Sequence, residues 1–111
     1  MSNLAAEKCP PCDQGGEALA GKALTDLERE LGGGWKVVNG HHLEKEFKFK
    51  DFRQALDFTN RIGEVAEQVG HHPDIYLTWG KVRVEIFTHT VNGLTRNDFV
   101  LAAKFEEAVK G

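Results

Sequence analysis

The middle of the chain carries a stripe of mostly apolar residues at helical spacing. Between residues 52 and 69 the stripe holds Phe52, Ala55, Leu56, Thr59, Ile62, Val65, Ala66 and Val69. Such spacing predicts an amphipathic helix with one face against a core. Asp51 followed by Gln54 is typical of a helix start, and Gly70 followed by Pro73 is typical of a helix end. We therefore expect a helix that starts after Asp51 and stops at Gly70.

The same start signal predicts two further helices. Thr25 with Glu28 predicts a short helix that stops at the glycine run of residues 32–34. Thr95 with Asp98 predicts a third helix that continues almost to the last residue. Its expected buried positions are Phe99, Ala102, Ala103 and Phe105.

Alternation at period two predicts strands between these helices. Val82, Val84 and Ile86 alternate with charged residues, so the segments 75–79 and 81–89 predict one hairpin. The segments 35–38 and 42–49 flank Asn39-Gly40, the dipeptide that best fits a tight hairpin turn, and predict another. The resulting order is α-β-β-α-β-β-α. We expect an α+β fold with a four-stranded antiparallel sheet and three helices on one face.

The length of 111 residues fits one domain, which we place at residues 22–111 behind a flexible leader over residues 1–21. The leader contains Cys9 and Cys12, but this pair lacks the further ligands of a zinc site and the strand-helix context of a redox pair. We expect two reduced thiols. A metal or redox role is the alternative.

Charge and hydropathy exclude several classes of partner. The formal net charge of -3 provides no basic surface for nucleic acid. The sequence contains no run of about 18 apolar residues, which a membrane span would require. Its first residues lack the apolar segment of a signal peptide. We expect a cytoplasmic protein.

Three histidines are the best indication of chemistry. His71 and His72 follow the predicted helix end, and His89 is expected to end a strand whose partner begins near Pro73, so the hairpin should bring the three imidazoles together. Imidazoles titrate near neutrality, which favours proton transfer. Capping of helix carbonyls by these histidines, or a metal site, is the alternative.

For other polar and aromatic residues we expect structural rather than chemical roles. His41 and His42 follow the Asn39-Gly40 turn and are expected to be solvated. Asp98 would stabilise the start of its own helix. Trp35 and Trp79 are expected to be partly buried in a small core.

A compound motif runs through the second half of the chain. It consists of Glu67, His71-His72-Pro73, Trp79, Thr88-His89, Gly93-Leu94-Thr95 and Asp98. This motif resembles that of the pterin-4a-carbinolamine dehydratase family. Trp35 and the segments 46–52 and 55–58 are also similar to the family, so the resemblance covers about residues 24–110. The family's order of elements is the one that the helix starts and the alternation predict.

The resemblance implies that a 4a-hydroxytetrahydropterin is dehydrated to the quinonoid dihydropterin, which recycles the cofactor of an aromatic amino acid hydroxylase. It implies that His71 and His89 act as acid and base, that His72 mainly orients the pterin and that Glu67 orients or tunes His71. Asp98 would support the pocket from its helix. The other residues implied to line the pocket are Trp35, Pro73, Thr88, Thr90 and Val91.

The resemblance also implies that the reaction needs no metal and no cofactor, and that the chain forms a homodimer or a homotetramer. Some animal members of the family act as dimerisation cofactors for a homeodomain transcription factor. The alternative function is therefore a protein-binding module for a transcription regulator, which a sheet with a solvated face and open edges would suit.

Overall fold

The computed structural model describes Leu4 and residues 18–110, and the leader's Cys9 and Cys12 lie outside these residues. The described part contains three α-helices, four strands and a short 3₁₀ helix. In chain order these are α1 (Gly21–Leu31), β1 (Lys36–Val38), β2 (His42–Lys48), α2 (Phe52–Val69), β3 (Asp74–Thr78), β4 (Lys81–Ile86), η2 (His89–Val91) and α3 (Arg96–Lys110). The predicted order of helices and strands is confirmed.

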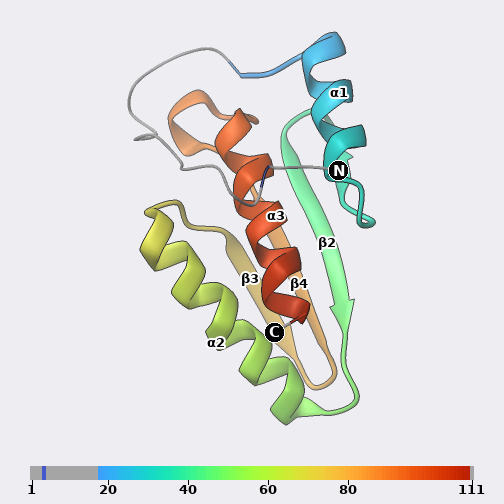
Figure 1. Cartoon of the computed structure of the whole chain (residues 1–111), viewed down its shortest axis with the longest axis vertical. Coiled ribbons are helices and arrows are strands. Elements are labelled where there is room, and N and C mark those ends of the chain that lie inside the picture. Colours follow the sequence, from blue (N-terminus) through green and yellow to red (C-terminus); the bar gives the residue numbers. More distant parts are fainter. Residues whose placement is uncertain (1–3, 5–17, 111) are drawn as a thin grey trace.

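The four strands form one antiparallel sheet in the order β1-β2-β4-β3. On β4, Val82, Val84 and Ile86 are fully buried, whereas the alternating charged residues are partly exposed. The helices cover the face to which these apolar side chains point, with α2 and α3 side by side and α1 next to α3 (Figure 1). The predicted α+β class is therefore confirmed. The other face of the sheet carries polar side chains.

The first hairpin turns at the predicted dipeptide. Asn39 and Gly40 have φ angles of 55° and 66°, and the His41 N–H donates to the Val38 carbonyl at 2.9 Å. Two successive positive φ angles give a turn whose twist matches that of the flanking strands, and Asn-Gly accepts them at low cost. This turn sets the register in which Leu43 of β2 lies opposite Val37 of β1.

Helix α2 has the predicted ends. The Asp51 carboxylate accepts the Gln54 N–H at 2.9 Å, and Gly70 closes the helix in the left-handed conformation with φ of 77°. The predicted buried stripe is partly wrong, because Phe52 is exposed and Phe58 is fully buried instead. Phe58 packs on Phe47 of the sheet with ring centroids 4.7 Å apart, which rotates the buried face of the first turn.

Helix α1 starts earlier than predicted, at Gly21 rather than after Thr25. Thr25 does not cap the helix, since its hydroxyl donates to the Gly21 carbonyl one turn back at 3.2 Å. Threonine can make this bond inside a helix, so the local start signal was misleading. The start predicted for α3 is confirmed: Thr95 precedes the helix, and its N–H donates to the Asp98 carboxylate at 2.8 Å.

Several element ends meet at one end of the molecule. Helix α2 ends and α3 begins there, and β4 leads into η2 at the same end (Figure 1). Strand β4 is shorter than predicted: it stops at Ile86, and His89 opens η2 instead of ending a strand. The chain reverses here because Thr88 and Gly93 exchange backbone hydrogen bonds of 2.8 and 3.3 Å.

Among the described residues, none of the helices has both the length and the apolar character needed to cross a bilayer.

Leu4 is fully buried and belongs to the hydrophobic core. The boundary between a leader and a domain at residue 22 stays a prediction, but the burial of Leu4 leads us to expect that its segment adds stability. Leu4→Ala should lower the free energy of unfolding by about 2–4 kcal/mol, as the loss of a buried leucine side chain does. Thermal unfolding measures this change, with Leu24→Ala at a partly buried position as the control. An unchanged melting temperature for Leu4→Ala would contradict the expectation.

Candidate active site

The centre of the candidate site is a buried carboxylate, that of Asp98 in the first turn of α3. Its Oδ1 lies 2.5 Å from His71 Nε2. Its Oδ2 accepts the Thr88 hydroxyl and the Thr95 N–H, each at 2.8 Å. Asp98 and Thr88 are almost fully buried, and His71 is 5% exposed. An ionised carboxylate only accepts hydrogen bonds, so His71 Nε2 carries a hydrogen and donates a hydrogen bond to Asp98.

The local sequence explains how His71 reaches this carboxylate. Gly70 turns the chain into the left-handed conformation, and the N–H groups of Gly70 and His71 both donate to the Ala66 carbonyl, at 2.9 and 3.3 Å. This closing turn directs His71 inward, toward the start of α3. His71 therefore takes a fixed position between two helix ends.

His72 has a different environment from its neighbour. Its side chain is 61% exposed, and its Nε2 lies 2.5 Å from Oε2 of Glu67, which is 73% exposed. Glu67 was expected to orient His71, and the structure corrects this, because Gly70 turns His71 away from the surface of α2. Glu67 orients His72, and Asp98 orients His71.

A shallow pocket of about 200 Å³ brings the three histidines together. It is lined by Gly70, His71, His72, His89 and Thr90. The expected proximity of His89 to the His71-His72 pair is confirmed, although a 3₁₀ turn rather than a strand end carries His89. The pocket therefore combines imidazoles that follow α2 with an imidazole that follows β4.

Not every residue expected to line the pocket does so. Pro73 and Val91 are partly buried outside the lining, and Thr88 lies behind it on Asp98. Trp35 is buried elsewhere: its indole N–H donates to Glu106 Oε1 at 2.9 Å, and its ring packs edge-on against Phe47. The core placement of Trp35 is confirmed, whereas Trp79 is 70% exposed at the β3-β4 turn, contrary to expectation.

Sequence reasoning missed the aromatic support of His89. The ring centroids of Phe87 and His89 are 4.3 Å apart, and those of Phe87 and His41 are 4.5 Å apart. His41 Nε2 also lies 3.1 Å from Oδ1 of Asn92, the residue that follows η2. His41 and His42 are therefore half-buried rather than solvated. The available signal was that Phe87, directly after β4, continues the outward positions of the alternation that predicted this strand.

The geometry suits proton transfer on a small bound molecule. His71 is fixed by a buried carboxylate and His72 by an exposed one, and the exposed ring of His89 lines the pocket and packs at an interplanar angle of 49° against Phe87. Groups of this type donate or accept protons near neutral pH. No metal ligand set is formed by the pocket residues among the side chains that the structure describes.

The sequence belongs to a known protein family. Residues 17–108 match the family described as pterin 4 alpha carbinolamine dehydratase. A protein of Alkaliphilus metalliredigens, whose name assigns it provisionally to the pterin-4-alpha-carbinolamine dehydratases, is 50% identical over 107 residues, 96% of each chain. Pterin-4-alpha-carbinolamine dehydratase 2 of Arabidopsis thaliana, a mitochondrial protein, is 38% identical over 96% of this chain and 59% of its own.

Solved structures support the same relationship. The crystal structure of a transcriptional coactivator/pterin dehydratase from Brucella melitensis superposes with a TM-score of 0.77 at 32% identity, over 83% of this chain and 98% of the other. The chain therefore belongs to the pterin-4-alpha-carbinolamine dehydratase family, a family of hydro-lyases. The resemblance drawn from the compound motif is confirmed.

Proposed function

We propose that this protein removes water from a 4a-hydroxytetrahydropterin and that His71 and His89 transfer the protons. The observation that carries the proposal is the meeting of His71 and His89 in one pocket, with His71 held on the buried Asp98. Family membership supports the pterin as substrate. The 4a-hydroxytetrahydropterin is the form in which an aromatic amino acid hydroxylase, the expected pathway partner, leaves its pterin cofactor, and its dehydration gives the quinonoid dihydropterin.

The reaction breaks the C4a–O bond and forms a C4a=N5 double bond. One imidazole donates a proton to the leaving hydroxyl, which departs as water, and the other accepts the proton of N5. His89 is exposed and can exchange protons with solvent, which restores the starting charge state. His71 Nε2 is occupied by Asp98, so the ring has a fixed orientation in the transition state.

A direct assay tests this proposal. Loss of the 4a-hydroxypterin absorbance should be faster with the purified protein than without it. A chelator should leave the turnover unchanged, because no step is assigned to a metal. Absence of acceleration would refute dehydration and favour the alternative, a protein-binding module, which the coactivator name of the Brucella relative supports.

His72 is proposed to orient the pterin rather than to transfer a proton. Its exposed ring, fixed by Glu67, lines the pocket. His72→Ala should raise KM several-fold with little change in kcat, because a group that only holds the pterin stabilises ground and transition states equally. Glu67→Gln should give a weaker form of the same change. Steady-state kinetics would contradict this assignment if kcat fell and KM stayed constant.

A homodimer or homotetramer is proposed for the assembly. Strands β1 and β3 are the edges of the sheet and present backbone groups that can pair with a second copy. Light scattering at micromolar concentration should therefore give a mass above the 12.4 kDa of one chain. A monomeric mass would contradict this proposal and leave the proposed chemistry untouched.

A further inference from the structure

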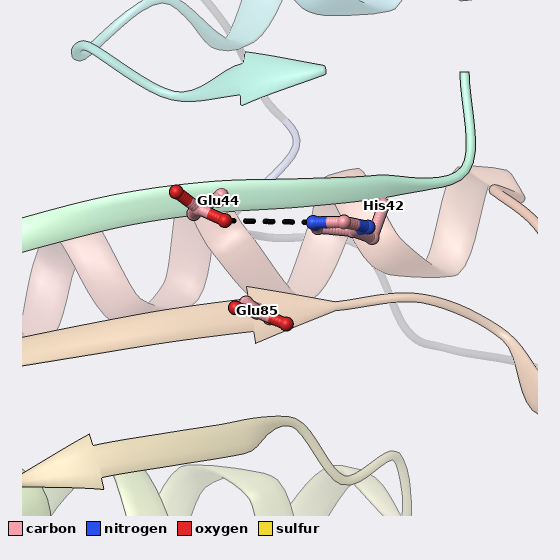
Figure 2. A group of neighbouring side chains, drawn as sticks. All are labelled: His42, Glu44 and Glu85. Carbon is pink, nitrogen blue, oxygen red and sulfur yellow. Dashed lines mark ion pairs between the residues drawn. The ribbon is translucent and has the colours of Figure 1, made fainter. Parts of the chain in front are cut away.

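A second cluster of polar side chains lies outside the pocket, on the face of the sheet that no helix covers. It consists of His42 and Glu44 from β2 and Glu85 from β4, and we call it the sheet cluster. One nitrogen or oxygen of each side chain lies within 4.8 Å of the others. All three residues are half-buried. Figure 2 shows the two carboxylates and the imidazole gathered over the neighbouring strands β2 and β4.

The strand register forces like charges together here. Glu44 of β2 is the direct partner of Glu85 on β4, and Glu85 is also the partner of Asp74 on β3. Carboxylates directly opposite each other in a sheet are destabilising. Arg83 Nε lies 3.5 Å from Glu85 Oε2, and Lys36 is the strand partner of Glu44. Two cations for three carboxylates leave this row with a net negative charge.

Two hydrogen bonds in series fix the tautomer of His42 and leave one of its ring nitrogens without a hydrogen beside these carboxylates. His41 Nε2 lies 3.1 Å from the Asn92 side-chain oxygen, which only accepts, so this nitrogen carries a hydrogen and donates a hydrogen bond to it. In a neutral His41 ring, Nδ1 is then an acceptor, and it lies 3.1 Å from His42 Nδ1. His42 Nδ1 donates to it. The second nitrogen of a neutral His42, Nε2, is left with its lone pair directed toward the cluster.

The distance across the cluster fits two ligands better than a hydrogen bond. His42 Nε2 lies 3.5 Å from Glu44 Oε1, beyond the range of about 2.7–2.9 Å for a hydrogen bond between an imidazolium and a carboxylate. Ligands at about 2.0–2.2 Å from a tetrahedral zinc ion lie roughly 3.4 Å apart. The His42–Glu44 pair has this spacing, and one oxygen of Glu85 lies within 4.8 Å of a nitrogen of His42 and an oxygen of Glu44, a separation that rotation of the Glu85 side chain can shorten.

From this arrangement we propose that His42, Glu44 and Glu85 bind a divalent first-row transition-metal ion such as Zn²⁺. Imidazole nitrogen and carboxylate oxygen are ligands that such ions accept, and three protein ligands leave a position for water. His41 is the outer partner that fixes the tautomer of His42, as the second ring nitrogen of a metal-binding histidine usually requires. The ion also neutralises the facing carboxylates of Glu44 and Glu85.

Zinc binding to the full-length protein tests the proposal by titration calorimetry. The leader contains Cys9 and Cys12, so all proteins carry Cys9→Ser and Cys12→Ser to remove thiolate ligands. This parent protein should bind one Zn²⁺ per chain. Glu44→Gln and Glu85→Gln should each weaken the affinity at least tenfold. His41→Phe, which removes only the outer partner, should weaken it by about tenfold or more.

Glu46→Gln is the matched control. Glu46 lies on the same face of β2 two residues beyond Glu44, forms an ion pair with Lys81 at 3.6 Å and does not belong to the cluster. Its substitution removes the same charge, so zinc affinity should stay within about twofold of the parent protein. An equal loss of zinc affinity in Glu46→Gln and Glu85→Gln would mean that zinc binding depends only on surface charge. That result would overturn the proposal.

Thermal unfolding separates a metal site from a structural ion-pair network. Without metal, Glu85→Gln should melt no lower than the parent, because the substitution removes repulsion between facing carboxylates. The same zinc concentration should then raise the melting temperature of the parent more than that of Glu85→Gln, because the weaker site gains less stability from the ion. The proposal is overturned if the parent binds no zinc at 100 µM, if Glu85→Gln binds it as tightly as the parent, or if metal-free Glu85→Gln melts several degrees lower.

Discussion

Replacing either His71 or His89 by alanine is expected to lower kcat by roughly 10²-fold or more, the usual contribution of one positioned acid or base. The two imidazoles line the same pocket and are assigned to the two proton transfers of one reaction. The double substitution should therefore cost less than the product of the two single losses, since groups that act in one step are not additive. Single-turnover absorbance measurements give these rates.

The two variants should differ in stability. His89 is exposed, so the melting temperature of His89→Ala should stay close to that of the unsubstituted protein. His71 is 5% exposed and is bonded to the fully buried Asp98, so His71→Ala leaves a buried carboxylate without its partner. Breaking such a pair costs about 3–5 kcal/mol. Rates for His71→Ala should be measured at a temperature where circular dichroism shows it folded.

Two results would contradict the assignment. A fully active His89→Ala would show that this imidazole transfers no proton in the rate-limiting step. A folded His71→Ala with a normal kcat would show that His71 is not one of the two proton-transfer groups. His41→Phe serves as the control for His89, because it alters the aromatic neighbours of Phe87 without removing a group from the pocket.

Asp98 is expected to affect both folding and catalysis, and two substitutions separate these effects. Asp98→Ala leaves His71, the Thr88 hydroxyl and the Thr95 N–H without their acceptor in a buried site. Unsatisfied buried donors cost about 1–3 kcal/mol each. The melting temperature of Asp98→Ala should therefore fall by roughly 10 °C or more. Differential scanning calorimetry measures this loss.

Asp98→Asn should fold but turn over slowly. The amide oxygen can still accept from Thr88 and Thr95, and the amide nitrogen then donates to His71 Nε2, which forces the proton of a neutral ring to Nδ1. A wrong tautomer at a catalytic imidazole costs far more in kcat than in stability. We expect a loss of at least about 10²-fold in kcat. A normal rate would show that Asp98 only stabilises its own helix.

Thr88 provides a graded version of this test. Its hydroxyl donates to Asp98 Oδ2 and contacts the Thr95 hydroxyl at 2.9 Å, so it holds the carboxylate from the side opposite His71. Thr88→Val should reduce kcat less than Asp98→Asn does, and Thr88→Ser, which keeps the hydroxyl, should restore it. Equal rates for the valine and serine variants would restrict Thr88 to a packing role.

The sequence alone determined the class of fold and most of the element ends. Asp51, Gly70 and Asn39-Gly40 act through their own hydrogen bonds and φ angles, which depend on few neighbours, so local rules predicted them correctly. The alternation of β4 likewise predicted which side chains face the helices. Thr25 shows the limit, since the same residue type also bonds within a helix.

The sequence also indicated which histidines belong to the site, and the compound motif indicated the family. An imidazole pair beside a helix end and an imidazole at the end of a strand were expected to meet, because an antiparallel hairpin returns the chain to its starting end. What could not be predicted was the partner of each ring. Glu67 was the sequence neighbour of both His71 and His72, and only the left-handed turn at Gly70 decides that it reaches His72.

The tertiary structure alone decided which distant side chains share a site. Asp98 lies 27 positions from His71 and meets it because α2 and α3 pack antiparallel with their ends aligned. Trp35 lies away from the expected pocket because its indole N–H donates to Glu106 on α3. Glu44 and Glu85 face each other because of the β2-β4 register. Such contacts depend on the packing of elements far apart in the chain, which local sequence patterns do not specify.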